Sequence, residues 1–164
     1  RQMCIRDRYI IKMNGISTMS INVTKRDGSI QPFDLNKVHK VLEWAVEGIS
    51  GVSMSEIELK ANIQLFDKIP AYDIHELLIK SAAELISENT PNYQFVAARL
   101  ISYKLRKEVY GDYQPCHLKQ IIAQNIEEGV YDKQILDKYS SKEIDELNNY
   151  IKHYRDDNFT YAGM

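Results

Sequence analysis

Apolar residues recur at helical spacing along most of this chain. In the first such stretch they recur one, three or four positions apart, at Leu35, Val38, Val41, Leu42, Ala45 and Ile49. Residues with this period share one face of a helix. The pattern predicts a helix that begins near residue 35 and ends at Gly48 and Gly51, because glycine commonly terminates helices.

The same period predicts three more helices before residue 112. Ser53 and Glu56 have the spacing of a capping box, so we expect a second helix from there through about residue 66. A third helix follows Pro70 and carries the apolar stripe Ile74, Leu77, Leu78, Leu85 and Ile86. A fourth should run from about residue 92 to 110, where Gly111 stops it. Four amphipathic helices of this length can bury a common core.

Residues 23–33 show a different pattern. A β-prone run leads to Asp27-Gly28, which favours a tight hairpin, and the chain returns through Ile30 to Phe33. Asp34 then stands where it can cap the first helix. The fold predicted for this part is mainly α (α+β), with a small β-hairpin or sheet capping a four-helix bundle.

Further helices are predicted after Gly111. One should begin near Pro115 and reach about residue 128. Ser140 and Glu143 have capping-box spacing for another helix that ends near Arg155. This segment has a thinner apolar face than the preceding one.

Composition narrows the classes of function. The formal net charge of the 164 residues is -2, so the surface as a whole does not attract nucleic acid, and no apolar run is long enough to cross a membrane. The two cysteines, Cys4 and Cys116, are too few for a disulfide framework or a four-cysteine zinc site. A reducing cytoplasm is the simplest compartment for such a chain.

Any anion site must therefore be a local concentration of positive charge. Lys25, Arg26 and Lys37 stand beside the predicted hairpin and the start of the first helix, where backbone N–H groups favour anions. The alternative is a solvated hairpin whose edge carries charges that prevent strand pairing.

The stretch from Val23 to Val38 resembles the opening of an ATP-cone, the regulatory nucleotide-binding domain at the start of many ribonucleotide reductase large subunits. The resemblance continues through Leu42–Ala45, Ile63–Asp67, Asp73–Glu76, Ala97–Leu100 and Leu105–Lys107. Tyr110-Gly111, Gly129–Asp132 and Arg155–Ala162 resemble the next segment of the aerobic class I enzyme of enterobacterial type.

The resemblance implies three segments. Residues 1–18 would be an unstructured or artefactual extension, 19–111 the ATP-cone, and 112–164 the truncated start of the helical domain of the large subunit.

It also implies a set of residues for the nucleotide. Lys25 and Arg26 would face the triphosphate, Lys37 the ribose or phosphates, and His75 and Lys107 the same phosphates.

The remaining positions would surround the base. Val23, Phe33, Val38 and Ile74 would form apolar walls around the purine, although all four could equally be core. Gln31 and Asp34 match the positions that read the adenine edge. Ala71 replaces the usual threonine, so one hydroxyl contact is missing.

The function so implied is allosteric. ATP or dATP, with Mg²⁺, would control the overall activity of a ribonucleoside-diphosphate reductase, which makes deoxyribonucleotides for DNA synthesis. Partners would be the radical-bearing small subunit and a second large subunit, which dimerises through other parts of the protein. We expect no direct nucleic-acid partner, no membrane partner and no metal ligand. The catalytic barrel is not represented, so the fragment itself should be inactive.

Two other readings stay open. One is the cone of a nucleotide-sensing DNA-binding repressor, although such proteins place a four-cysteine zinc ribbon before the cone. The other is a helical interaction module that has lost nucleotide binding, for which Ala71 is the argument.

Overall fold

The computed structural model describes residues 21–25 and 27–164, so Arg26 and the extension predicted for residues 1–18 lie outside the described residues. The elements in chain order are β1 (Asn22–Thr24), β2 (Ile30–Pro32), α2 (Leu35–Val46), α3 (Met54–Asn62), β3 (Ile69–Pro70), α4 (Ala71–Ala83), α5 (Tyr93–Tyr110), α6 (Leu118–Glu127), α7 (Gln134–Lys138), α8 (Ser141–Tyr150), η1 (His153–Asn158) and η2 (Tyr161–Gly163). The predicted fold class, mainly helical with a small sheet, is confirmed.

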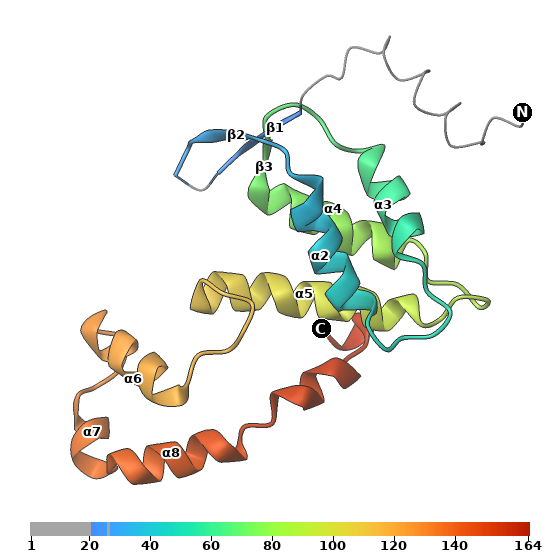
Figure 1. The fold of residues 1–164 in the computed structure, drawn as a ribbon. Helices are drawn as coiled ribbons and strands as arrows, with labels where there is room; N and C mark the ends of the chain where they lie inside the picture. Colours follow the sequence, from blue (N-terminus) through green and yellow to red (C-terminus); the bar gives the residue numbers. More distant parts are fainter. Residues whose placement is uncertain (1–20, 26) are drawn as a thin grey trace, which may run out of the picture.

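The hairpin is part of a three-stranded sheet with the order β2-β1-β3. β1 and β2 are antiparallel with Val23 opposite Gln31, whereas β1 and β3 are parallel with Val23 opposite Ile69. The turn uses Gly28 at a φ of 80°, a left-handed conformation that glycine adopts without strain. The sheet lies over one end of the helices (Figure 1).

β3 was not predicted, and it shortens the helix before it. The expected second helix reached residue 66, but α3 ends at Asn62. The loop that follows is tied to β1, since Asn22 donates from its backbone N and its Nδ2 to Asp67 Oδ1 at 2.9 and 3.0 Å. Thr24 Oγ1 also donates to the Lys68 carbonyl at 3.0 Å. These bonds hold the segment extended against the sheet.

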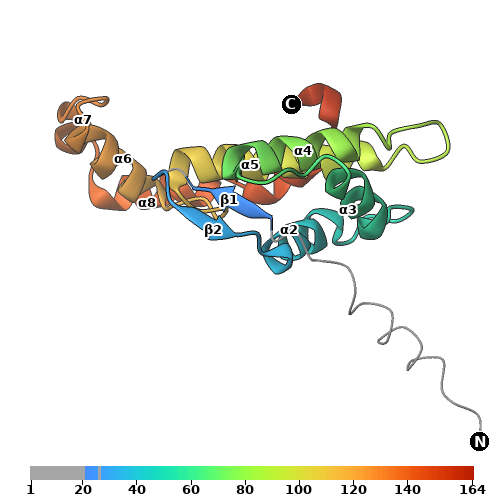
Figure 2. The same cartoon turned by 90° about the horizontal axis from the view of Figure 1, so that it is seen from above.

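Helices α2, α3, α4 and α5 form the bundle (Figures 1 and 2). Their shared core contains the fully buried Leu42, Ile57, Leu78, Tyr93, Val96 and Leu100. The Tyr93 hydroxyl accepts from the Ser53 backbone N at 2.8 Å and donates to Glu56 at 2.7 Å. The predicted capping box is therefore wrong: the Ser53 side chain makes no cap bond, and the Ser53 N–H and the Glu56 carboxylate, which a capping box would pair, both bond to the Tyr93 hydroxyl instead. Burial raises the pKa of Tyr93.

The third and fourth helices follow the prediction with small shifts. α4 ends at Ala83, before Leu85 and Ile86 of the expected stripe. α5 ends at Tyr110, and Gly111 follows in the left-handed conformation at φ 73°, as the helix-stop signal predicted.

The C-terminal part forms a second, smaller group of helices. α6 and α8 pack together and project away from the bundle (Figures 1 and 2). α6 begins at Leu118 rather than near Pro115, and α7 was not predicted. The Ser140–Glu143 capping box is present, but α8 ends at Tyr150 and not near Arg155. The chain then returns to α5 through η1 and η2.

Candidate functional site

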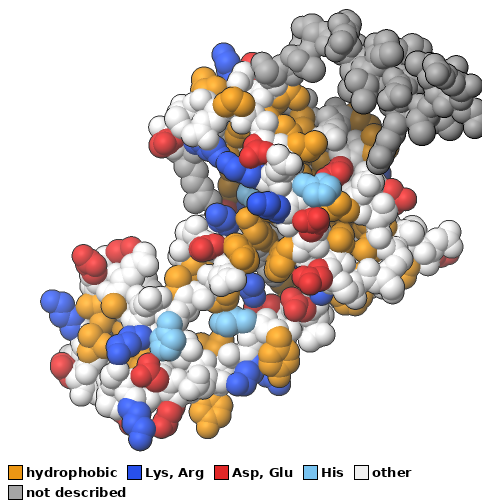
Figure 3. All heavy atoms as spheres, in the orientation of Figure 1, with side chains coloured by type: hydrophobic (Ala, Val, Ile, Leu, Met, Phe, Trp, Pro, Cys, Tyr) orange, Lys and Arg blue, Asp and Glu red, His pale blue; other side chains and the backbone are white. Residues whose placement is uncertain are grey.

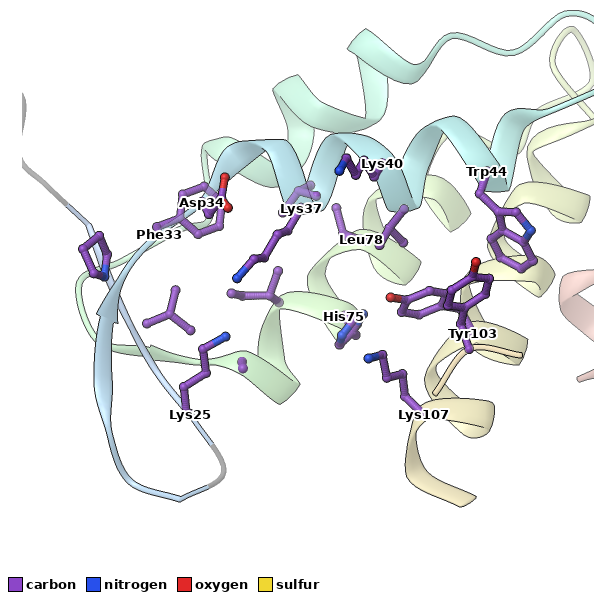
Figure 4. Close-up of a pocket in the computed structure, with 17 residues that line it drawn as sticks. Lys25, Phe33, Asp34, Lys37, Lys40, Trp44, His75, Leu78, Tyr103 and Lys107 are labelled. Carbon is purple, nitrogen blue, oxygen red and sulfur yellow. The ribbon is translucent and has the colours of Figure 1, made fainter. Parts of the chain in front are cut away.

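A cavity of about 490 Å³ lies between the sheet and helices α2, α4 and α5 (Figure 4). Ten of the twelve residues predicted from the sequence line it: Val23, Lys25, Phe33, Asp34, Lys37, Val38, Ala71, Ile74, His75 and Lys107. Positions more than 80 residues apart in the chain thus meet at one concave surface, large enough for a ligand of nucleotide size.

Basic side chains enter the cavity from four separate parts of the chain. Lys25 follows β1, Lys37 lies in the first turns of α2, His75 in α4 and Lys107 near the end of α5. Figure 4 shows the three lysine amino groups and the His75 ring directed toward one shared space. In Figure 3, Lys and Arg side chains gather beside the hairpin and α2. This local concentration makes the cavity suited to an anion.

The start of α2 contributes to the same electrostatics. Asp34 Oδ1 accepts from the Asn36 backbone N at 3.0 Å, which confirms Asp34 as the helix cap. Asp34 is also the single carboxylate among the lining residues, and it lies at the hairpin end (Figure 4). The Asp34 carboxylate offsets part of the positive end of the α2 dipole, whereas the lysine groups meet no second acid among the lining residues.

The apolar residues serve the cavity and the core together. Val23 is buried, and Val38 and Ile74 pack against the bundle core while also lining the cavity. Phe33 lies at the hairpin end, next to Asp34 (Figure 4). Packing fixes this wall in place before any ligand arrives.

An aromatic group at the opposite end was missed by the sequence reasoning. The rings of Trp44 and Tyr103 lie 5.9 Å apart, Tyr103 stacks on Tyr113 at 5.9 Å and 13°, and His75 lies 5.4 Å from Tyr103. Burial raises the pKa of Tyr103, and the nearby Asp112 adds to the effect. The sequence did contain a pattern from which Trp44 and Tyr103 could have been predicted.

Trp44 comes seven residues after Lys37, and Tyr103 four before Lys107, so each shares a helix face with a predicted site residue. Pro32, Lys40, Val41 and Leu78 were also missed. Lys40 and Val41 lie one turn beyond Lys37 and Val38. Tyr113 had no such signal, because it follows the end of α5.

Gln31 is the predicted residue in the described part of the chain that does not line the cavity. It is exposed on β2, directly opposite Val23. Its neighbour Pro32 lines the cavity instead. Ala71, the first residue of α4, does line the cavity, so a hydroxyl at that position would face the ligand space.

The side chains do not fit a magnesium ion held by protein ligands alone. Within the described residues, no group of three or more His, Cys, Asp or Glu side chains is arranged to hold a metal. Mg²⁺ prefers carboxylate and phosphate oxygens, and Asp34 is the one carboxylate on the cavity surface.

Among the described residues, no helix combines the length and apolar character needed to cross a membrane.

Fold and cavity define a small domain in which a sheet and a helix bundle enclose a pocket lined by basic side chains. The family model for the ATP cone domain matches residues 21–108, and the chain belongs to that family. Tyr113 lies beyond the matched range.

The relatives extend further along the chain. It is 45% identical over 145 residues to the ribonucleoside-diphosphate reductase subunit alpha of Buchnera aphidicola subsp. Schizaphis graminum, covering 88% of this chain and 19% of the relative. It is 45% identical over 142 residues to ribonucleoside-diphosphate reductase 1 subunit alpha of Escherichia coli, covering 87% and 19%. The subunit alpha of enterobacteria phage T4 is also 45% identical, over 145 residues, with 87% and 19% covered. The chain thus spans about a fifth of the length of these relatives.

These matches confirm the resemblance on which the sequence-based reading depended. The division at residues 111 and 112 and the role of each lining residue stay predictions.

Proposed function

We propose that this chain binds ATP and dATP and serves as the effector domain that controls the overall activity of a ribonucleoside-diphosphate reductase. The observation that carries the proposal is the cavity in which Lys25, Lys37, His75 and Lys107 converge opposite an apolar wall. A nucleoside triphosphate has the matching division into a highly charged end and a flat apolar base. Membership of the ATP cone family supports the same ligand class.

Lys25, Lys107 and His75 would bind the triphosphate, and Lys37 would reach the ribose or phosphates. A lysine ammonium acts on phosphate as a compact point charge, and the start of α2 adds backbone dipoles of the same sign. Because the cavity surface has a single carboxylate, Mg²⁺ would be held by phosphate oxygens and water. Arg26, which lies outside the described residues, is proposed as a further phosphate contact.

The base would lie against Val23, Phe33, Val38 and Ile74. Asp34 uses Oδ1 as a helix cap, and its second carboxylate oxygen could accept from the adenine amino group. Guanine presents a carbonyl at the equivalent place, which a carboxylate would repel. Gln31, which is exposed on β2 and does not line the cavity, would assist only from the rim.

The regulated enzyme is proposed from the relatives, which are named as alpha subunits of ribonucleoside-diphosphate reductase. Reduction of the substrate would occur in parts of the protein outside this chain. The radical-bearing small subunit, a second large subunit and a cytoplasmic location belong to this proposal.

Calorimetry of residues 13–164 with ATP, dATP and GTP tests the proposal. We expect heat of binding with both adenine nucleotides and at least tenfold weaker binding of GTP, which corresponds to about 1.4 kcal/mol. Circular dichroism of the same sample checks that the chain is folded. A folded chain that gives no heat with ATP or dATP would contradict the proposed function.

A further inference from the structure

The segment around Arg155–Ala162 does not line the cavity, and most of its residues are exposed, yet it contacts the bundle. Its residues form η1 and η2, and both of these short helices pack against α5 (Figure 1). About 50 residues separate the two contact partners along the chain. Side-chain contacts are therefore needed to hold η1 and η2 against α5.

Two ion pairs connect η1 to α5. Arg106 Nη2 lies 2.6 Å from Asp156 Oδ2, and Arg99 Nε lies 3.9 Å from Asp157 Oδ1. The two arginines are seven residues apart, which places them two turns apart on one face of α5. Each arginine side chain is only 16% exposed. A guanidinium held in such a place loses hydration, so the carboxylate beside it is an important partner.

Arg99 also contacts α2, a second helix that lines the cavity. Arg99 Nη1 donates to the Ala45 carbonyl at 3.3 Å and to the Glu47 carbonyl at 2.6 Å. These carbonyls belong to the C-terminal end of α2, which has no basic residue of its own in its last turn. A cation at this end of a helix satisfies free carbonyls and complements the helix dipole.

Both connected helices carry cavity residues. α2 supplies Lys37 and Trp44, and α5 supplies Tyr103 and Lys107. On α5, Arg99 is one turn before Tyr103, and Arg106 directly precedes Lys107. A change in how η1 sits on α5 therefore acts on the helix that positions one side of the cavity.

We propose that residues 153–158 are a strap that positions the walls of the nucleotide cavity through Asp156 and Asp157. Arg99, Arg106, Asp156 and Asp157 are positioning residues that act on Tyr103, Lys107 and α2. This inference rests on the proposed nucleotide binding. By linkage, a ligand that is favoured when the strap is docked must in turn stabilise the docked strap, by the same factor.

Hydrogen exchange measured by mass spectrometry on the whole 164-residue chain tests the reciprocal effect. ATP should slow backbone exchange in residues 153–163, which do not line the cavity, as well as in α2 and α5. If the contact between η1 and α5 were purely structural, residues 153–163 would exchange at the same rate with and without nucleotide. No ATP-dependent change in residues 153–163 overturns the strap.

Calorimetry of charge-removing variants tests the forward effect. Asp156→Asn keeps the shape of the side chain but removes its charge, and we expect ATP affinity to fall about fivefold or more, the lower range of measured site coupling. Asp137→Asn, an exposed carboxylate on α7, is the matched control and should leave affinity within twofold. Exchanging the pair, Arg106→Asp with Asp156→Arg, should restore part of the loss. Equal affinity of Asp156→Asn and the wild-type chain overturns the inference.

The two hypotheses fail in different ways. If the wild-type chain binds no adenine nucleotide, the proposed function is wrong. If it binds ATP but the strap neither changes its exchange nor affects affinity, only the strap is wrong. Should Asp156→Asn fail to fold, the exchange measurement on the wild-type chain decides alone.

Discussion

At the scale of single residues, the cavity depends on a few charged side chains that enter it from different elements. Lys25 and Lys107 come from opposite walls and are separated by 82 positions in the sequence. Neither forms an ion pair in the described part of the chain, so their charge is available to a ligand. That distinguishes them from Lys104, whose ammonium is paired with Glu76 and lies 4.3 Å from the centre of the Tyr72 ring.

We expect Lys25→Ala or Lys107→Ala to weaken ATP binding by about 1–3 kcal/mol each, the range for a hydrogen bond to a charged group. Lys138→Ala, an exposed lysine on α7, serves as the matched control and should change the affinity by less than about 0.5 kcal/mol. Calorimetry at two salt concentrations measures both effects. Equal losses in all three variants would indicate non-specific attraction to positive charge rather than a defined site.

At the scale of elements, α2 is both a structural and a binding element. Its N-terminal cap, Asp34, lies on the cavity surface, and its C-terminal carbonyls are held by Arg99. The helix is thus fixed at both ends by contacts that also belong to the site or to its support. Different substitutions of Asp34, its N-terminal cap, should therefore separate the effect on folding from the effect on nucleotide selection.

Two variants of Asp34 separate these roles. Asp34→Ala should lower the free energy of unfolding by about 1 kcal/mol, the usual value of a lost helix cap. Asp34→Ser keeps a capping oxygen and should retain that stability, yet it removes the carboxylate proposed to accept from adenine. We therefore expect Asp34→Ser to narrow the difference in affinity between ATP and GTP. Urea unfolding measures the first effect, and calorimetry the second. Unchanged discrimination in the folded Asp34→Ser variant would limit Asp34 to its capping role.

At the scale of the whole molecule, the proposed control requires that nucleotide binding change how subunits meet. A ligand shifts such an equilibrium only through a difference in affinity between the two assembled states. ATP and dATP differ by one ribose hydroxyl, so that difference must arise near the sugar, where Lys37 is proposed to lie. Ala71 leaves the cavity without a hydroxyl at the start of α4.

We expect dATP, more than ATP, to bring the complete large subunit and its small subunit into a larger complex. Light scattering of the mixed subunits with each nucleotide measures the mass. Ala71→Thr is the informative variant, since an added hydroxyl on the cavity surface should sharpen the difference between the two nucleotides. The same mass with ATP and with dATP would contradict this form of regulation while leaving nucleotide binding itself intact.

Features set by neighbours along the chain could be predicted from the sequence. The Asp27-Gly28 turn, the Asp34 cap, the stop at Gly111 and the Ser140 capping box all depend on residues within about four positions of one another. Helical periodicity likewise located α2, α4 and α5. The site residues themselves followed from family resemblance, and the fold then brought ten of them to one surface.

Contacts between distant residues were decided by the tertiary structure alone. β3 forms because Asp67 and Lys68 bond to β1, 44 or 45 residues earlier. The Glu56 carboxylate accepts a hydrogen bond from Tyr93, 37 residues later, and does not take part in a capping box. Tyr113 joins the cavity only because the chain after α5 turns back onto Tyr103, and Asp156 meets Arg106 across 50 residues. Local sequence sets which conformations a segment prefers, but which polar group finds a partner depends on what packing brings within hydrogen-bonding distance.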